Sequence, residues 1–168
     1  MERIRPIRYK PDWSKIPVDS IRNNMELFKS VDPSADYQGE FQTKATTRTN
    51  TRIARLPPQT SKVDELNKIF ENFGYDKMNY ISFIELPANV GYPSHVDTAR
   101  GCNINFVKAP ASPIIYNGKQ YNWDRFFMDP SIHHEVPANE VARFTIMLTY
   151  MDSSYDEIHE LLKRDGWV

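Results

Sequence analysis

The chain has 168 residues, of which 40% are hydrophobic and 26% charged, the balance of a globular protein long enough to bury a core. Its formal net charge of −1 argues against a strongly basic nucleic-acid clamp, so we expect no nucleic-acid partner. The single cysteine, Cys102, excludes an internal disulfide framework. Apolar runs are short, which predicts no membrane partner, and the simplest inference is a reduced, cytoplasmic compartment.

Charge is distributed unevenly along the chain. Residues 1–62 carry 12 Lys and Arg against 7 Asp and Glu, whereas residues 63–168 carry 9 against 15. Either the basic third attracts an acidic partner or substrate, or it packs on the acidic remainder, which is the more common arrangement. Nothing in the sequence indicates the oligomeric state. We expect one domain with three parts: a basic N-terminal arm with substrate-side elements (1–60), a helix followed by a β core (61–152) and a closing helix (153–168).

The first part of the chain predicts an extended arm and two helices. Three prolines within the first 17 residues disfavour a helix there. Apolar residues at helical spacing predict helices over 18–29 and 61–73, the second capped by Thr60 or Ser61. Between them, the Thr- and Arg-rich segment 42–56 predicts a strand and a loop.

After Gly74 the pattern changes to short β-strands separated by turns, which is typical of a β-sandwich or barrel. The dipeptide Asn117-Gly118 is the signature of a type I′ hairpin turn. A last helix is expected after Ser154, where Glu157 completes a capping box. The strands are expected over 80–86, 102–107, 114–116, 120–123, 126–128, 132–136 and 142–150.

Two histidines and an aspartate suggest a metal site. On an extended segment, residues two apart point the same way, so His95 and Asp97 can share one ion. His134 follows 37 residues after Asp97, enough chain to return to the same mouth of a barrel. His133 competes with it, but neighbours on a strand face opposite sides, and the spacing to Arg143 favours His134. Two imidazoles and one carboxylate on one face of a metal form the facial triad of non-haem Fe(II) oxygenases.

An arginine that points inward from the next predicted strand indicates an anion-binding site. Arg143 lies nine residues after His134, and Thr145 shares its face. Burying a guanidinium is costly unless it meets an anion, and it can hold a carboxylate through two hydrogen bonds. A dicarboxylate such as 2-oxoglutarate fits this arrangement, with one end on the metal and the far carboxylate at Arg143 and Thr145.

The order and spacing of these residues resemble those of the Fe(II)- and 2-oxoglutarate-dependent dioxygenases, and the approach Leu-Pro-Ala-Asn-Val-Gly-Tyr-Pro-Ser-His at 86–95 looks most like their prolyl 4-hydroxylase branch. The resemblance covers about residues 80–150. It implies an α+β, mainly β chain whose core is a double-stranded β-helix (jelly-roll), with helices packed on one side. The motifs that carry it are His95-x-Asp97, His134-Glu135-Val136 and Arg143-x-Thr145.

The resemblance also implies an activity. His95, Asp97 and His134 would bind Fe(II), and Arg143 would bind the distal carboxylate of 2-oxoglutarate. With O2 as cosubstrate and ascorbate as a candidate reductant, such an enzyme hydroxylates an amino-acid or peptidyl substrate, for example a prolyl one, and releases succinate and CO2. The substrate would be a small molecule, a peptide or a protein.

The sequence departs from the prolyl hydroxylase pattern at two positions. Leu86 stands where many members have a tyrosine that helps to hold 2-oxoglutarate, and Asn89 stands where a glycine is common, which puts the prolyl substrate in question. Other residues have two interpretations. One of Asn103 and Asn105 either contacts 2-oxoglutarate or substrate or makes a structural hydrogen bond. Tyr92 either lines the substrate side or packs in the fold.

Two other function classes fit the same residues. A cupin-like protein of the same architecture would bind a metal or small ligand without oxygenase activity. An interaction module would act through the basic N-terminal third, and its function would survive loss of the metal ligands. Zinc bound in purified protein would not decide between them, because it outcompetes Fe(II) at such ligands.

Overall fold

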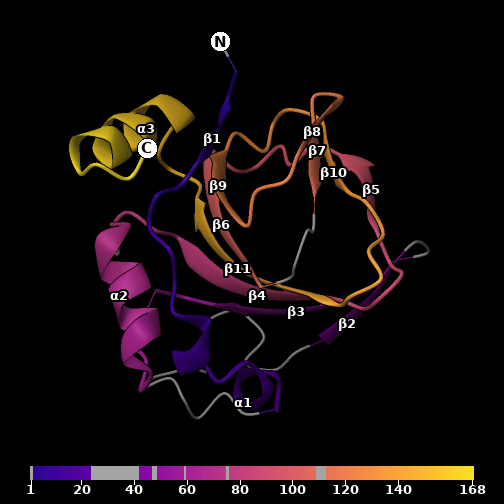
Figure 1. Cartoon of the computed structure of the whole chain (residues 1–168). Coiled ribbons are helices and arrows are strands. Elements are labelled where there is room, and N and C mark those ends of the chain that lie inside the picture. Colours follow the sequence, from indigo (N-terminus) through magenta and orange to yellow (C-terminus); the bar gives the residue numbers. More distant parts are fainter. Residues whose placement is uncertain (1, 24–41, 47–48, 59, 75, 109–112) are drawn as a thin grey trace.

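Two antiparallel β-sheets face each other and form a jelly-roll, with the helices gathered on the outer side of the larger sheet (Figure 1). The computed structural model describes residues 2–23, 42–46, 49–58, 60–74, 76–108 and 113–168. The prediction of a mainly β jelly-roll core with helices on one side is therefore confirmed.

Among the residues that the structure describes, the larger sheet has seven strands and the smaller one has four. In spatial order, the larger sheet contains β1 (Ile4–Pro6), β9 (Arg125–Met128), β6 (Cys102–Lys108), β11 (Arg143–Tyr150), β4 (Tyr80–Leu86), β3 (Thr49–Leu56) and β2 (Gln42–Thr46). The smaller sheet contains β5 (Tyr92–His95), β10 (His134–Val136), β7 (Ile114–Tyr116) and β8 (Lys119–Tyr121).

Alternation along the central strands creates two different faces. On β11, the side chains of Phe144, Ile146 and Leu148 belong to the main hydrophobic cluster beneath the helices. The residues that alternate with them, Arg143, Thr145 and Met147, point the other way and line the space between the sheets. Strand β6 repeats the pattern, so the larger sheet carries a dry outer face and a partly polar inner face.

In the described part of the chain, four helical elements accompany the sheets: η1 (Trp13–Lys15), α1 (Val18–Asn23), α2 (Asp64–Asn72) and α3 (Tyr155–Arg164). Leu66 and Ile69 of α2 and Ile158 of α3 are buried in the main cluster. Helix α3 has the expected capping box, in which the Ser154 hydroxyl accepts a hydrogen bond from the backbone N–H of Glu157.

The predicted cap of the second helix is wrong. Helix α2 begins two residues later than a Ser61 cap requires and three later than a Thr60 cap requires, with Val63 at the N-cap position and no side-chain cap. The Ser61 hydroxyl instead accepts the backbone N–H of Val63, 2.9 Å away, which uses it in the turn before the helix.

Other local expectations meet the structure in different ways. Segment 42–56 forms two paired strands, β2 and β3, rather than one strand and a loop. Asn117 and Gly118 both have positive φ (49° and 75°), as a type I′ turn requires, and Gly74 ends α2 with φ +72°. The expected helix over 18–29 is observed as α1, and residues 24–29 lie outside the described part of the chain.

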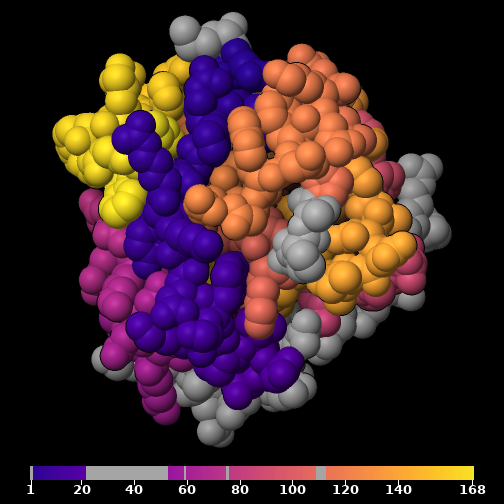
Figure 2. All heavy atoms as spheres, viewed as in Figure 1, coloured from indigo at the N-terminus to yellow at the C-terminus, as the bar shows by residue number. Residues whose placement is uncertain are grey.

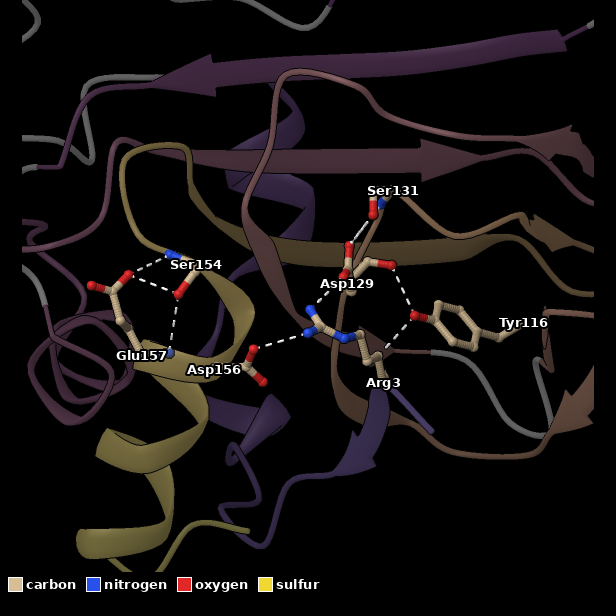
Figure 3. Close-up of polar contacts among 7 residues, drawn as sticks. All are labelled: Arg3, Tyr116, Asp129, Ser131, Ser154, Asp156 and Glu157. Atoms are coloured by element: carbon tan, nitrogen blue, oxygen red, sulfur yellow. Dashed lines mark hydrogen bonds and ion pairs between the residues drawn. The ribbon is translucent and has the colours of Figure 1, made fainter. Parts of the chain in front are cut away.

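The N-terminal segment runs across the face of the molecule in Figure 2, between the C-terminal helix and the strands of the later sequence. Arg3 anchors it, because its guanidinium donates to Asp129 at 3.0 Å and to Asp156 at 2.9 Å (Figure 3). The Tyr116 hydroxyl lies 2.9 Å from the carbonyl oxygens of both Arg3 and Asp129. At Arg3, therefore, the basic N-terminal arm packs on acidic residues from the remainder of the chain.

Among the described residues, no helix has the length and apolar character that crossing a membrane requires.

Candidate metal centre

His95 and His134 are brought together by strand pairing. Strand β5 ends at His95 and β10 begins at His134, and these two residues are direct partners in the antiparallel register. Their ring centroids lie 4.2 Å apart. Asp97 follows β5 in a loop whose position is held by a 2.8 Å hydrogen bond from the Asp97 backbone N–H to the Pro130 carbonyl. One candidate ligand atom from each of the three side chains lies within 4.8 Å of the others.

Hydrogen bonds orient both imidazoles for ligation. The Nδ1 atom of His95 lies 2.8 Å from the Pro93 carbonyl, and Nδ1 of His134 lies 2.9 Å from the Ile132 carbonyl. Because a carbonyl oxygen only accepts, each Nδ1 carries the proton and each Nε2 keeps its lone pair. This is the arrangement that metal-binding histidines usually have. Burial also lowers the pKa of His134, which favours the neutral form that ligates a metal.

Arg100 shares the Asp97 carboxylate. Its Nη1 donates to Asp97 Oδ2 at 2.7 Å, and the same oxygen lies 3.9 Å from His134 Nε2. Arg100 therefore holds the carboxylate of Asp97 in place beside the His134 imidazole. From the sequence, Arg100 after the ligand loop could either contact a substrate anion or lie on the surface, and the structure places it against Asp97.

A cavity of about 220 Å³ lies between the two sheets beside these three residues. Arg143 and Thr145 line it from β11, and Arg143 is only 5% exposed. The guanidinium donates from Nε to Thr145 Oγ1 at 3.3 Å and from Nη1 to the Pro113 carbonyl at 3.1 Å. Burial lowers the pKa of Arg143 to about 10, so it remains charged at neutral pH.

The remaining predicted residues line the same cavity. Asn103 and Asn105 project from β6 into it, opposite the dry face of that strand. The buried Oδ1 of Asn103 accepts no hydrogen bond within the part of the chain that the structure describes, so it is available to a ligand or water. Tyr92 also lines the cavity, with its ring edge-on to His95 at 4.6 Å. In contrast, the side chain of His133 is exposed, and it is His134 that joins the cluster.

The outer side of this site carries two arginines, of which the sequence pattern does not single out Arg55. Arg55 of β3 lines the cavity, as does Arg100, and both guanidinium groups lie over the ring of Tyr80 at 4.7 and 5.9 Å. The Arg-rich composition of segment 42–56 was the available signal, but it does not tell which arginine faces inward.

Comparison with known proteins identifies the fold. No protein-family model matches the chain, and no curated protein matches it. A solved structure of a Pseudomonas putida prolyl-4-hydroxylase matches with a TM-score of 0.51 and 13% identity, covering 68% of this chain and 78% of that one. A 2OG-Fe(II) oxygenase family oxidoreductase from Burkholderia pseudomallei matches with a TM-score of 0.45 and 8% identity, covering 62% and 69%. The cupin domain of Schizosaccharomyces pombe Cnp3 matches with a TM-score of 0.43 and 13% identity, covering 80% and 77%.

At identities this low, structural similarity shows a shared jelly-roll fold alone, and the chemistry has to be argued from the residues of the site. What the site offers is a set of three nitrogen and oxygen ligands, oriented by neighbouring carbonyls, at one end of a cavity that a buried arginine also lines.

Proposed function

We propose that the protein is an Fe(II)- and 2-oxoglutarate-dependent dioxygenase that hydroxylates an amino-acid or peptidyl substrate. The observation that carries the proposal is that His95, Asp97 and His134 meet beside the cavity that Arg143 lines. Two neutral imidazoles and one carboxylate leave the remaining positions of an octahedral ion open, and this donor set suits non-haem Fe(II). The residues therefore fit the metal that the proposal requires.

The chain's own residues would divide the work. His95, Asp97 and His134 would hold the ion, while the Pro93 and Ile132 carbonyls keep both imidazoles in the ligating tautomer. Arg143 and Thr145 would bind the far carboxylate of 2-oxoglutarate, since a buried guanidinium supplies both charge and a rigid pair of donors. When bound, iron and 2-oxoglutarate supply the oxidation: one atom of O2 enters succinate as CO2 leaves, and the other enters the substrate as a hydroxyl group.

The alternative is a cupin-like protein that binds a metal or small ligand without oxygenase activity. The buried Arg143 favours the oxygenase, because a metal site alone needs no cation on the cavity wall. A prolyl substrate is one member of the proposed class, and ascorbate is a proposed reductant rather than a required part of the site.

The deciding experiment is succinate release. Metal-free protein is loaded anaerobically with Fe(II), which avoids occupation by zinc, and 2-oxoglutarate is added. The proposal expects a weak visible charge-transfer band, and then succinate formation on addition of O2 that rises with the correct substrate pool. Metal binding without the band and without succinate would favour the cupin-like alternative.

A further inference from the structure

An open groove of about 630 Å³ adjoins the candidate metal centre on its outer side. The groove and the inner cavity share three lining residues, Arg55, Asp97 and Arg100. A molecule in the groove therefore reaches the metal ligands past two guanidinium groups. Within the described residues, Asp97 is the only carboxylate that lines either space.

The two arginines are held in place by one aromatic ring. Arg55 and Arg100 both lie over Tyr80, and Asp97 Oδ2 is the only oxygen among the described residues that accepts a hydrogen bond from Arg100. The Nε atom of Arg55 is buried and has no hydrogen-bond partner in the described part of the chain. A buried guanidinium donor without a partner is costly, so Arg55 is placed to receive an acceptor from outside.

The strand register places Arg55 and Arg143 at different levels of the larger sheet. Arg55 pairs with Ser82, and Ser82 pairs with Met147, which places Arg55 in the cross-strand row of Met147. Arg143 lies four residues from Met147 along β11, so the backbones at the two arginine positions are offset by roughly 13 Å along the strand direction. Arg143 lines only the inner cavity, whereas Arg55 and Arg100 also line the outer groove, so a molecule in the groove meets the outer pair first.

Charge balance indicates that Arg55 and Arg100 bind a second anion. A divalent ion and Arg143 would be neutralised by Asp97 and the two carboxylates of 2-oxoglutarate. The positive charges of Arg55 and Arg100 are then left over at the mouth of the cavity, where a second anion would neutralise them.

We infer that this groove is the substrate entrance, and that Arg55 and Arg100, supported by Tyr80, bind a carboxylate of the substrate. This inference rests on the proposed function and narrows its substrate class to carboxylates. The carboxylate belongs either to a free amino acid or to an acidic side chain of a peptide, and Arg55 is a specificity-determining residue for it.

The test measures calorimetric binding of two matched pairs of compounds to the full-length, metal-free protein. The first pair is N-acetyl-L-alanine and its amide; the second is acetyl-Gly-Glu-Gly-amide and its Gln analogue. In at least one pair, the carboxylate should bind about tenfold more tightly than its neutral partner, since hydrogen bonds to charged groups are the strong ones. The first pair tests recognition of an α-carboxylate, as in an amino acid, and the second tests recognition of an acidic side chain in a peptide.

Variants then locate the binding. Arg55→Gln, which leaves the Asp97–Arg100 pair intact, should reduce the carboxylate preference severalfold, and Arg55→Gln/Arg100→Gln should abolish it. The preference should persist in Arg143→Gln and in the matched control Arg164→Gln, which changes an exposed arginine of α3. Circular dichroism checks that each variant is folded. If Arg55→Gln is not folded, Arg55→Lys takes its place.

Two results would overturn the inference: no carboxylate preference in either pair, or a preference lost in Arg143→Gln but kept in the Arg55/Arg100 double variant. Failure of the proposed function is seen separately. It appears as absent metal binding or absent succinate, whereas carboxylate binding is measured without metal.

Discussion

His95 and His134 are directly opposite each other on neighbouring antiparallel strands, so the pairing of β5 with β10 places both imidazoles at one point. The register shifts between His134 and Val136, which confines this alignment to the first residue of β10. The two histidines are 39 positions apart in the chain, and the hydrogen-bonded ladder accounts for their proximity.

The first prediction concerns this pair. His134→Ala should weaken Mn²⁺ or Fe²⁺ binding by at least about a hundredfold, because loss of a ligand exceeds the 10–100-fold effect of losing a ligand's supporting partner. His133→Ala is the matched control, since it changes the adjacent, exposed imidazole and should leave affinity unchanged. Anaerobic calorimetric titration measures both, and equal losses in the two variants would contradict the assignment.

Arg143 should determine the response to 2-oxoglutarate. A ligand that binds only the folded protein adds about 2.7 kcal/mol to the free energy of unfolding at a hundred times its Kd. In thermal unfolding of metal-loaded protein under anaerobic conditions, Arg143→Gln should lose most of this stabilisation. Arg143→Lys should keep a small part, because an ammonium group lacks the two-pronged geometry. A full stabilisation in Arg143→Gln would place the dicarboxylate elsewhere.

Much of this site could be anticipated because its residues follow strand periodicity. The alternation in β11 put Arg143 and Thr145 on one face, and the same logic put Asn103 and Asn105 together. The histidine choice also followed, because neighbouring residues on an extended segment point in opposite directions, so only one of them can face inward. The helix cap at Ser61 failed because a hydroxyl can bond backbone either before or inside the helix, and sequence alone does not choose.

The outer arginines show where such reasoning ends. Whether Arg55 faces the cavity depends on which strand pairs with β3 and in what register. That pairing is set by tertiary packing rather than by neighbouring residues. Arg100 lies in a loop, where no periodicity predicts its contact with Asp97.

Two buried tyrosines should respond oppositely to removal of the hydroxyl. The Tyr155 hydroxyl is buried and has no partner among the described residues, whereas the Tyr116 hydroxyl contacts two carbonyls. Tyr155→Phe should therefore leave the free energy of unfolding unchanged or raise it by about 1 kcal/mol, and Tyr116→Phe should lower it by about 1 kcal/mol. Urea unfolding measures both, and a larger loss in Tyr155→Phe would mean that its hydroxyl is bonded.

Alkaline pH should destabilise the fold through ionisation of the same buried tyrosine hydroxyl groups. Burial raises the pKa of Tyr155 to about 12, and it also raises the pKa of Tyr116. An unfolded tyrosine has a pKa near 10, so above that pH the folded state binds more protons than the unfolded state. The contribution of these phenols to stability is complete below about pH 10 and is lost as pH rises through their folded pKa values. Tyrosinate absorbance should therefore appear together with loss of circular dichroism, and Tyr155→Phe should reduce the decline.

Gly101 should tolerate no side chain. A Cβ atom there would lie 1.9 Å from the Ser153 carbonyl oxygen, and backbone on both sides prevents easy relief. Gly101→Ala should lower the free energy of unfolding by about 3 kcal/mol, the upper range for overpacking. Gly118→Ala is the control: it meets no atom within 4 Å, so only its positive φ costs about 1–2 kcal/mol. Denaturant unfolding compares them, and a milder effect at Gly101 would show that the contact is relieved.

The smaller sheet that carries both histidines has short strands, and Ile114, Tyr116 and Tyr121 of its strands β7 and β8 belong to a second, smaller hydrophobic cluster rather than to the main one. Regions with less buried apolar surface open more readily than the core. Separation of β5 from β10 would dismantle the ligand set while the helix-covered sheet stays intact. Ion binding and closure of that strand pair are thus thermodynamically linked. A cation bound to both imidazoles would stabilise the pairing of β5 with β10, and sequence changes remote from the imidazoles would alter ion affinity by changing how often that pair opens.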